Sequence, residues 1–159
     1  MESGARLDQT APLELSEVAR SAAELYEPVV EEKGFTLSMV ADEPGVRISG
    51  DWHLLSQALA NLLENALKYA GGGHIELRVF HKDGQAILEV ADQGPGIPEA
   101  DRQSVLDRFV RLEPSRTTPG NGLGLSLVRA IARRHDGSVT LEDNRPGLRV
   151  RLQFPRLPT

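Results

Sequence analysis

Apolar residues recur along this 159-residue chain with two different spacings, and the order of those spacings indicates the fold. Spacings of three and four residues predict helices, whereas alternation predicts strands. The resulting order favours an α+β fold: a two-layer α/β sandwich with one mixed, mostly antiparallel sheet of about five strands and about three helices on one face. Helices are expected at residues 15–33, 51–70 and 123–135, with a short one near 99–109, and strands at 35–40, 46–49, 74–81, 85–91, 138–142 and 148–154.

Local signals place the boundaries of these elements. Asp51 is a good N-cap for the second helix, and Pro28 should kink the first helix or split it. Lys82-Asp83-Gly84 separates two alternating segments and predicts a hairpin turn. Residues 1–12 are polar and are expected to form a flexible linker stub, so that residues 13–159 make up one domain.

Composition excludes several classes of function. The chain is 40% hydrophobic and 26% charged, with a net charge of −5. An acidic chain is a poor general binder of nucleic acid, because that affinity depends on Lys and Arg neutralising phosphates. The absence of cysteine excludes disulfides and cysteine metal sites. No apolar run approaches the roughly 20 residues of a membrane helix, and the polar N-terminus does not look like a signal peptide, so we expect a cytoplasmic domain without membrane contact.

The second predicted helix has a polar face opposite its apolar stripe. At 3.6 residues per turn, Asn61, Asn65 and Lys68 fall within about 60° of one another. One interpretation is a solvated surface. The other is that an Asn carbonyl oxygen ligates Mg²⁺, which prefers oxygen ligands, while Lys68 neutralises phosphate. The next residue, Tyr69, could cover a nucleotide base or simply pack.

A carboxylate stands where the chain is expected to leave the sheet, in the sequence AILEVADQGPGI. Asp92 at this point could accept a hydrogen bond from the exocyclic amine of adenine. Guanine presents an oxygen there and would leave the carboxylate unpaired, so one Asp can select the base. Gly94 and Gly96 would let the backbone approach the ring closely. The alternative is an ordinary turn of the Asx type.

Three glycines lead directly into the last predicted helix, in the sequence GNGLGLSLV that begins at Gly120. Backbone N–H groups and the positive end of the helix converge there, which favours an anion site. The pattern is neither a GxxxxGK[ST] phosphate loop nor a dinucleotide-binding βαβ unit. A flexible loop is the alternative. The upstream residues that could fold onto a polyphosphate are Arg116, Thr117 and Thr118.

Taken together, these segments resemble the catalytic, ATP-binding domain of two-component sensor histidine kinases, in the superfamily shared with DNA gyrase, Hsp90 and MutL. NLLENALKY resembles the N box, DQGPGI the first glycine box, DRFVR around Phe109 the F box, and GNGLGL the second glycine box. The resemblance covers roughly residues 13–157. It implies the Bergerat fold, with nucleotide held between helices and a mobile lid over roughly residues 100–121.

Carried over position by position, the resemblance implies ATP or ADP and Mg²⁺ as ligands. It makes Asn65 the Mg²⁺ ligand, Asn61 a second amide of the site, Lys68 and Arg116 contacts to phosphate, and Asp92 the partner of adenine. Asn61, Lys68 and Arg116 are the implied catalytic residues. The other implied nucleotide contacts are Tyr69, Gly94, Gly96, Ile97, Phe109, Thr117, Thr118, Gly120, Gly122, Leu123, Gly124 and Leu125.

Two absences bear on the reaction. The hydrolytic relatives place a Glu where this chain has Asn61, and the neighbouring Glu64 lies on a different azimuth, so water attack is expected to be slow. The phosphoacceptor motif of the kinases is also missing. Of the four histidines, two are expected at the surface or at caps and two at strand ends: His53 and His135, and His74 and His81.

The resemblance therefore implies a fragment of a longer kinase that transfers the γ-phosphoryl group to a His on a separate dimerisation hairpin. A response regulator is the implied downstream partner, and the isolated domain is expected to be a monomer that does not phosphorylate itself. The parent kinase is the part that would carry any membrane anchor. The alternatives are a stand-alone serine kinase of the anti-sigma-factor type, a degenerate nucleotide-binding module that acts through protein partners, and, least favoured, a gyrase-like ATPase.

Overall fold

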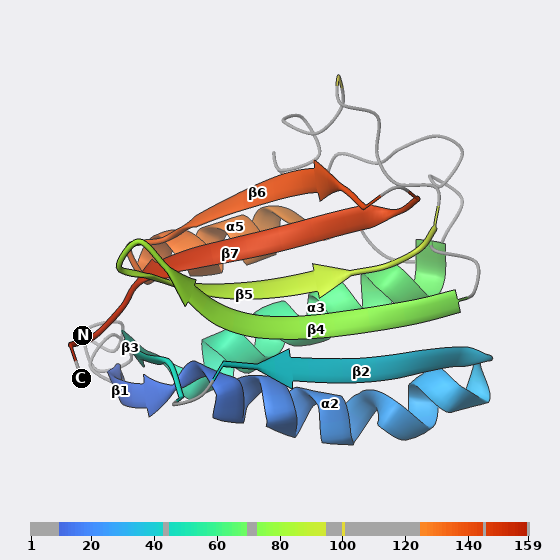
Figure 1. The fold of residues 1–159 in the computed structure, drawn as a ribbon, viewed down its shortest axis with the longest axis horizontal. Helices are drawn as coiled ribbons and strands as arrows, with labels where there is room; N and C mark the ends of the chain where they lie inside the picture. Colours follow the sequence, from blue (N-terminus) through green and yellow to red (C-terminus); the bar gives the residue numbers. More distant parts are fainter. Residues whose placement is uncertain are drawn as a thin grey trace, which may run out of the picture.

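Helices and strands separate into two layers in the computed structural model, which describes residues 10–42, 45–69, 73–94, 100, 125–144 and 146–158. Figure 1 shows a five-stranded sheet with the described helices packed as a second layer, as predicted. The described helices are α2 (Leu15–Glu32), α3 (Trp52–Tyr69) and α5 (Leu125–Arg134). The strands of this sheet are β2 (Phe35–Ala41), β4 (Gly73–Lys82), β5 (Gln85–Ala91), β6 (Ser138–Asp143) and β7 (Leu148–Pro155).

Strand β5 lies in the middle of the sheet, whose order is β2-β4-β5-β7-β6. Strands β2 and β4 are parallel, and the other neighbouring pairs are antiparallel. The prediction of a mixed, mostly antiparallel sheet is therefore confirmed. Because β4 and β7 flank β5, the residues that follow Ala91 emerge between two neighbouring strands.

The turn between β4 and β5 follows the predicted hairpin chemistry. Lys82 pairs with Gln85, which leaves only Asp83 and Gly84 in the loop. Both loop residues have positive φ angles, 52° at Asp83 and 77° at Gly84. Two-residue hairpin loops favour such turns because their twist matches that of the strands. The hairpin register is thereby set locally.

Helix α3 buries the apolar stripe that the sequence predicted. The stripe residues are at most 3% exposed, and α3 contacts both α2 and α5. Burial of a leucine side chain contributes about 1.5–3 kcal/mol, so this stripe fixes the rotation of α3 about its axis. The residues concerned are Leu55, Leu59, Leu62, Leu63 and Ala66.

Helix α2 is one continuous helix with Pro28 inside it. Of the two outcomes expected at Pro28, a kink or a split, the split is wrong. Pro28 lacks an N–H, so the carbonyl of Glu24 loses its usual partner within the helix. Both residues are exposed, so water can bond that carbonyl, and the apolar face of α2 continues past the interruption to the buried Val30.

A two-stranded ribbon lies outside the main sheet and was only half predicted. Strand β1 (Ala11–Glu14) pairs antiparallel with β3 (Arg47–Gly50), with Ala11 opposite Gly50. Strand β3 was expected, but Ala11 and Pro12 were assigned to the polar stub. A strand of four residues that contains a proline is too short to show the alternation by which strands are predicted from sequence.

Both described ends of the chain meet at this ribbon. Strand β1 begins at Ala11, and near the other end the N–H of Leu157 donates to the carbonyl of Arg47 on β3, with an N–O distance of 2.9 Å. Figure 1 shows the ribbon at one end of the molecule, while β5 and α3 run toward the other end. The two ends of the described chain therefore lie close together, at the end of the molecule opposite to the carboxyl end of β5.

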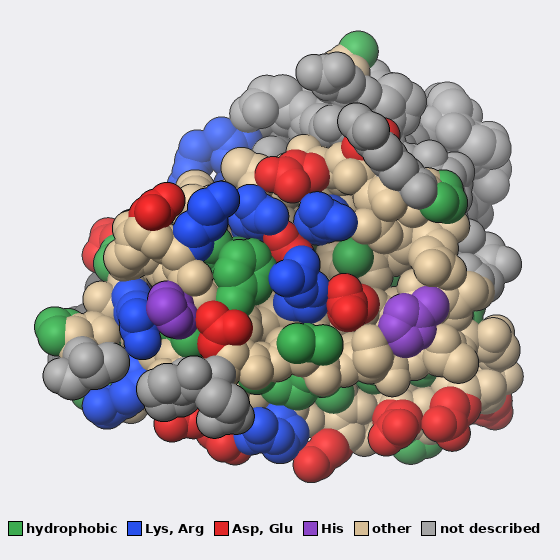
Figure 2. Space-filling view, in the orientation of Figure 1, with side chains coloured by type: hydrophobic (Ala, Val, Ile, Leu, Met, Phe, Trp, Pro, Cys, Tyr) green, Lys and Arg blue, Asp and Glu red, His purple; other side chains and the backbone are tan. Residues whose placement is uncertain are grey.

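The sheet face opposite the helices carries charged side chains, which Figure 2 shows gathered over the middle of the strand layer. Glu89 is fully buried there and accepts hydrogen bonds from Arg78 Nη1 at 3.3 Å and Arg151 Nε at 2.7 Å. The Arg78 guanidinium also lies 4.9 Å from the ring centroid of Phe80. A buried carboxylate requires partners of this kind, and in this cluster the arginines supply them.

Asp51 caps α3, as predicted. Its Oδ1 accepts hydrogen bonds from the N–H groups of His53 at 2.9 Å and Leu54 at 3.2 Å. The N–H of Asp51 donates to Nε2 of His135 at 3.0 Å, and the other ring nitrogen lies 2.8 Å from the carbonyl oxygen of Ile131. His135 is only 6% exposed, so of its two expected places, the surface and a helix cap, the surface is wrong. The bond to Ile131 places the ring at the carboxyl end of α5, as a cap, and the bond from Asp51 joins this end to the start of α3.

Replacing Asp51 with Ala is expected to destabilise the fold by about 1 kcal/mol, since two N–H groups of the first helical turn lose their acceptor. For a domain of this size the midpoint of thermal unfolding should fall by about 2–4 °C. The backbone N–H that bonds His135 is retained, so the variant reports the cap alone. Asp51→Asn keeps an acceptor and serves as the control. Equal midpoints for the Ala variant and the wild type would contradict the capping role.

None of the described helices combines the length and the apolar composition needed to cross a membrane.

Candidate functional site

The predicted polar face of α3 is present. Asn61 and Asn65 lie one turn apart and are half-buried, and Lys68 is exposed near the end of the helix. This face is set by the buried stripe on the other side of α3. The two amides and the ammonium group are thus held on one side of a helix that cannot rotate without exposing its leucines. Tyr69 is the last residue of α3.

Glu64 faces α2 and is engaged there. The hydroxyl of Tyr26 donates to Oε2 of Glu64, with an O–O distance of 2.9 Å. Burial, together with this hydrogen bond and the charge of Glu64, raises the pKa of Tyr26 to about 12. The Tyr26 hydroxyl therefore keeps its proton at neutral pH and remains a donor to the carboxylate.

Asp92 follows β5 directly and is held by backbone groups. Its N–H donates to the carbonyl of Leu148 at 2.9 Å. Its Oδ1 accepts from the N–H of Gly94 at 2.9 Å and from the N–H of Leu148 at 3.2 Å. The bond to Gly94 has the spacing of an Asx turn, the arrangement that the sequence left open as an alternative.

The environment of Asp92 disfavours its charge. Burial raises the pKa of Asp92 above 3.8, and the hydrogen bonds from Gly94 and Leu148 oppose this shift without cancelling it. Both backbone donors bond to the same oxygen, Oδ1. A desolvated carboxylate of this kind is the sort of group that recurs at functional sites.

Residues from the β6–β7 turn contact Asp92, and sequence analysis missed them. Asn144 Nδ2 donates to the carbonyl oxygen of Asp92 at 2.6 Å, and Gly147 packs against the same carbonyl. On the other side of β5, the N–H of His74 donates to Oε1 of Gln93 at 3.1 Å. The only sequence signal was the turn composition of the segment NRPG, which gives no hint of a partner more than fifty residues away.

The remaining predicted site residues fall mainly outside the described part of the chain. Gly94 is described and buried, and Leu125 is the first residue of α5 and 2% exposed. The expected short helix at 99–109 and the lid at 100–121 are not described beyond Ala100. The predicted contacts outside the description are Gly96, Ile97, Phe109, Arg116, Thr117, Thr118, Gly120, Gly122, Leu123 and Gly124.

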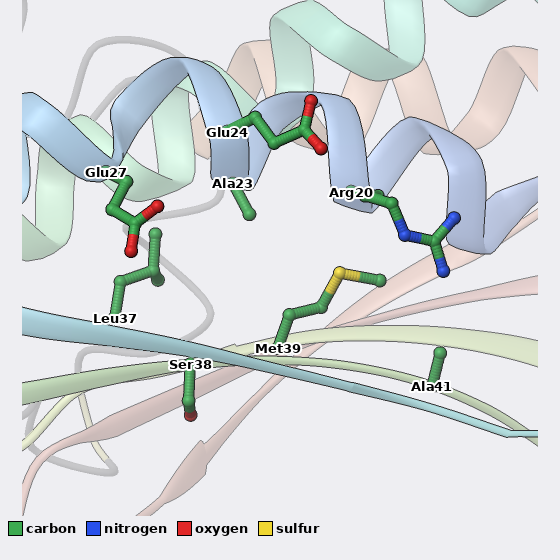
Figure 3. A pocket seen from close by; sticks show the side chains of 8 residues that line it. All are labelled: Arg20, Ala23, Glu24, Glu27, Leu37, Ser38, Met39 and Ala41. Carbon is green, nitrogen blue, oxygen red and sulfur yellow. The ribbon is translucent and has the colours of Figure 1, made fainter.

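The elements that carry the described site residues end on the same side of the molecule. Figure 1 shows the carboxyl ends of α3 and β5 and the β6–β7 turn toward one end, away from the chain termini. By contrast, a groove of about 390 Å³ lies between α2 and β2. Figure 3 shows Glu27 and Arg20 from the helix extending toward the strand that carries Leu37 and Met39. None of the predicted nucleotide contacts within the described residues lines this groove.

Comparison of the chain with known proteins identifies its family. The model of the family described as histidine kinase-, DNA gyrase B- and HSP90-like ATPase matches residues 50–158. The chain belongs to this ATPase family. The match includes α3, Asp92, the β6–β7 turn and α5. The resemblance drawn from the sequence boxes is thereby confirmed.

The relatives are histidine kinases. The chain is 44% identical over 105 residues, 65% of its length, to the signal transduction histidine-protein kinase/phosphatase MprB of Mycobacterium sp. (strain KMS). It is 42% identical over 112 residues, 69% of its length, to the adaptive-response sensory kinase SasA of Synechococcus sp. (strain JA-2-3B'a(2-13)). The chain spans 20% of the length of MprB and 29% of that of SasA.

A solved structure of an intact relative has the same fold. The crystal structure of full-length ShkA in complex with AMPPNP matches 98% of this chain with a TM-score of 0.82 and 29% sequence identity. The matched region makes up 34% of the ShkA chain. The two-layer α/β fold of this ATPase family is therefore present over nearly the whole chain.

Proposed function

We propose that this domain binds Mg·ATP and presents the γ-phosphoryl group to a histidine on a helical hairpin of a longer sensor kinase. The observation that carries the proposal is the site of Asp92, a desolvated carboxylate at the end of the central strand in a member of this ATPase family. MprB and SasA are named as kinases of signal transduction and sensing, and ShkA was solved with AMPPNP, an analogue of ATP.

Adenine is selected by Asp92 in this proposal. Two backbone N–H groups bond to Oδ1 and hold the carboxylate in one orientation, which assigns Oδ2 to the exocyclic amine of adenine. Guanine places an oxygen at that position, and two acceptors would then face each other in a partly desolvated site. Gly94 and Gly96 allow the backbone to approach the ring, and Tyr69, Ile97 and Phe109 are assigned to the surroundings of the nucleotide.

The donor chemistry of α3 fits Mg²⁺. Asn65 supplies a hard amide oxygen from a half-buried position, with Asn61 one turn earlier. The described residues contain no group of three or more His, Asp or Glu side chains placed to hold a metal. Mg²⁺ in nucleotide sites commonly has one or two protein ligands and takes the rest from phosphates and water. Bound there, Mg²⁺ would neutralise charge on the phosphates.

In this proposal, positively charged side chains and backbone N–H groups bind the phosphates of ATP. Lys68 lies near the end of α3, and Arg116 is carried by the segment before the glycines. Gly120, Gly122 and Gly124 precede α5, which begins at Leu125, so their N–H groups and the helix dipole can face an anion. The upstream residues Thr117 and Thr118 and the glycine-flanking Leu123 complete the proposed phosphate contacts. Positioning and charge stabilisation are the main contributions that a protein makes to phosphoryl transfer.

Transfer to a protein acceptor is favoured over hydrolysis by the residues around Asn65. An amide at Asn61 cannot remove a proton from water, and the nearby Glu64 accepts a hydrogen bond from Tyr26 on α2. If neither residue acts as a general base, attack is left to a nucleophile brought from elsewhere. This favours a kinase over the gyrase-like alternative.

The acceptor histidine is assigned to the part of the parent kinase outside this chain. His135 is buried with both ring nitrogens engaged, and the ring nitrogens of His74 lie 2.7 Å and 2.9 Å from the hydroxyls of Thr36 and Ser38. A helical hairpin of the parent kinase is the proposed partner, followed by a response regulator, and the isolated domain is proposed to be a monomer in the cytoplasm. The kinase relatives favour this over an anti-sigma-type serine kinase or a degenerate module.

Calorimetric titration tests the proposal first. ATP is expected to bind with an affinity that falls when EDTA removes Mg²⁺, and GTP is expected to bind far more weakly. In the presence of a histidine-kinase hairpin domain, labelled phosphate from ATP should appear on its histidine, whereas an anti-sigma antagonist protein should stay unlabelled. Labelling of a serine on the antagonist instead would favour the serine-kinase alternative. An absence of ATP binding would contradict the proposed function and favour a degenerate module.

A further inference from the structure

We propose that the β6–β7 turn, through Asn144 and Gly147, positions Asp92 and thereby sets how strongly the domain recognises the exocyclic amine of adenine. The inference rests on the proposed function, in which Asp92 is the partner of that amine. Asn144 and Gly147 contact the backbone of Asp92, so they are positioning residues that act through it.

Asn144 holds the backbone of Asp92 from one side. Its Nδ2 donates to the carbonyl oxygen of Asp92 at 2.6 Å, and its Oδ1 accepts from Arg149 Nη2 at 2.9 Å. Its own N–H donates to the carbonyl of Gly147 at 3.0 Å, which closes the turn. Both ends of the Asn144 amide are therefore fixed, and the amide cannot flip without losing one bond or the other.

Gly147 leaves room that no other residue would leave. Its φ angle is 114°, a conformation that L side chains rarely adopt. A Cβ on residue 147 would overlap the carbonyl oxygen of Asp92 and would lie 2.9 Å from the Cα of Gln93. The backbone of the turn is thus in direct contact with the backbone of Asp92. Any side chain at position 147 has to push Asp92 away or distort the turn.

The contacts of Asn144 and Gly147 both affect the Asp92 carboxylate, because Asp92, which follows β5, is still paired with Leu148 of β7. The N–H of Asp92 donates to the carbonyl of Leu148, and the N–H of Leu148 donates to Oδ1 of Asp92. Leu148 directly follows Gly147, so a shift of the turn moves one of the two donors that orient the carboxylate. On the β4 side, the bond from His74 to Gln93 holds the next residue. Asp92 is thereby fixed between the two strands that flank β5.

The test compares ATP with purine riboside triphosphate, which is ATP without the exocyclic amine. Asn144→Ala and Gly147→Ala should each weaken ATP binding by about tenfold, since a misplaced carboxylate loses one charge-assisted hydrogen bond. Binding of the amine-free analogue should be unchanged in both variants, because it makes no such bond. Titrations are made on the full 159-residue chain with Mg²⁺ present.

The hairpin turn at the other end of β5 offers a matched control. Gly84 also has a positive φ angle, 77°, but a Cβ added there meets nothing within 4 Å. Gly84→Ala therefore imposes a comparable backbone penalty without touching Asp92, and both ligands should bind it as they bind the wild type. If Gly147→Ala does not fold, Asn144→Ala alone decides the question.

Two outcomes would overturn the inference. One is an Asn144→Ala variant that binds ATP as tightly as the wild type, and the other is equal weakening of ATP and the analogue, which would mean a general structural role. Asp92→Asn measured in parallel distinguishes the proposed role of Asp92 from the proposed role of the β6–β7 turn. If Asp92→Asn itself binds ATP normally, the failure lies in the proposed role of Asp92. If Asp92→Asn loses ATP while Asn144→Ala does not, only the inference about the turn fails.

Discussion

Asp92→Asn is expected to lower the affinity for ATP by about tenfold to about a hundredfold while the domain stays folded. A hydrogen bond to a charged group contributes about 1.5–3 kcal/mol, which corresponds to that range. Asn retains an oxygen that can accept from the N–H groups of Gly94 and Leu148. Its amide nitrogen, however, would stand where the adenine amine needs an acceptor. Because that nitrogen can donate to the oxygen of guanine, the preference for ATP over GTP should fall as well.

The stability of this variant provides an independent check. Burial raises the pKa of Asp92 above 3.8, so the folded state favours the protonated form. The stability that this preference contributes is present at low pH and is lost as the pH rises through the raised pKa. At neutral pH the half-buried carboxylate therefore costs stability, and the neutral Asn should leave the thermal midpoint unchanged or raise it. Below the raised pKa this advantage should disappear.

Calorimetry with ATP and GTP, together with thermal melts at several pH values, measures both effects. Asp83→Asn is the matched control: it removes one carboxylate at the exposed β4–β5 turn, where Asn tolerates the positive φ angle of 52°. This control should bind ATP normally. If Asp92→Asn bound ATP as tightly as the control, Asp92 would not be the partner of adenine.

Asn65→Ala is expected to abolish the dependence of ATP binding on Mg²⁺. The wild type should bind ATP more tightly with Mg²⁺ than with EDTA, because the Asn65 oxygen would hold the metal and the metal would supply positive charge to the phosphates. Without that oxygen the ratio of the two affinities should approach one. The stripe of leucines on the opposite side of α3 is untouched, so the fold should be retained.

Titrations with and without Mg²⁺ give the ratio directly. Gln57→Ala removes another amide from the same side of α3, two turns earlier, at an exposed position, and should preserve the wild-type ratio. An Asn65→Ala variant with an unchanged ratio would place the metal ligand at another residue. An equal loss of affinity with Mg²⁺ and with EDTA would point to contact with the nucleotide itself.

Features that depend on neighbours in the sequence were predictable. The apolar spacing located α3, and the Asp83-Gly84 turn located the β4–β5 hairpin, because three- and four-residue spacing and turn chemistry are local properties. The position of Asp92 after β5 followed from the end of strand alternation. The proposed role of Asp92 as the partner of adenine then depended on the resemblance of the sequence motifs to those of the family. The residues alone fitted an Asx turn equally well, and the structure contains that turn.

Features that depend on distant partners were not predictable. Nothing near His135 in the sequence indicates that its ring accepts from the N–H of Asp51. Asn144 and Gly147 similarly looked like ordinary turn residues, and only the pairing of β7 with β5 brings them to Asp92. Strand β1 was missed because its four residues, with Pro12 among them, are too few to show alternation, and its pairing partner β3 lies more than thirty residues away.

The β1–β3 ribbon, where the described chain ends meet, also determines how the domain can be moved. The described chain enters at Ala11 and leaves past Leu157 beside this ribbon, opposite to the carboxyl end of β5. When a rigid domain rotates about an attachment at one end, the atoms farthest from that attachment move the most. Asp92 and the β6–β7 turn lie at that far end, so modest changes in the attached segments would move the proposed nucleotide site toward or away from the proposed acceptor.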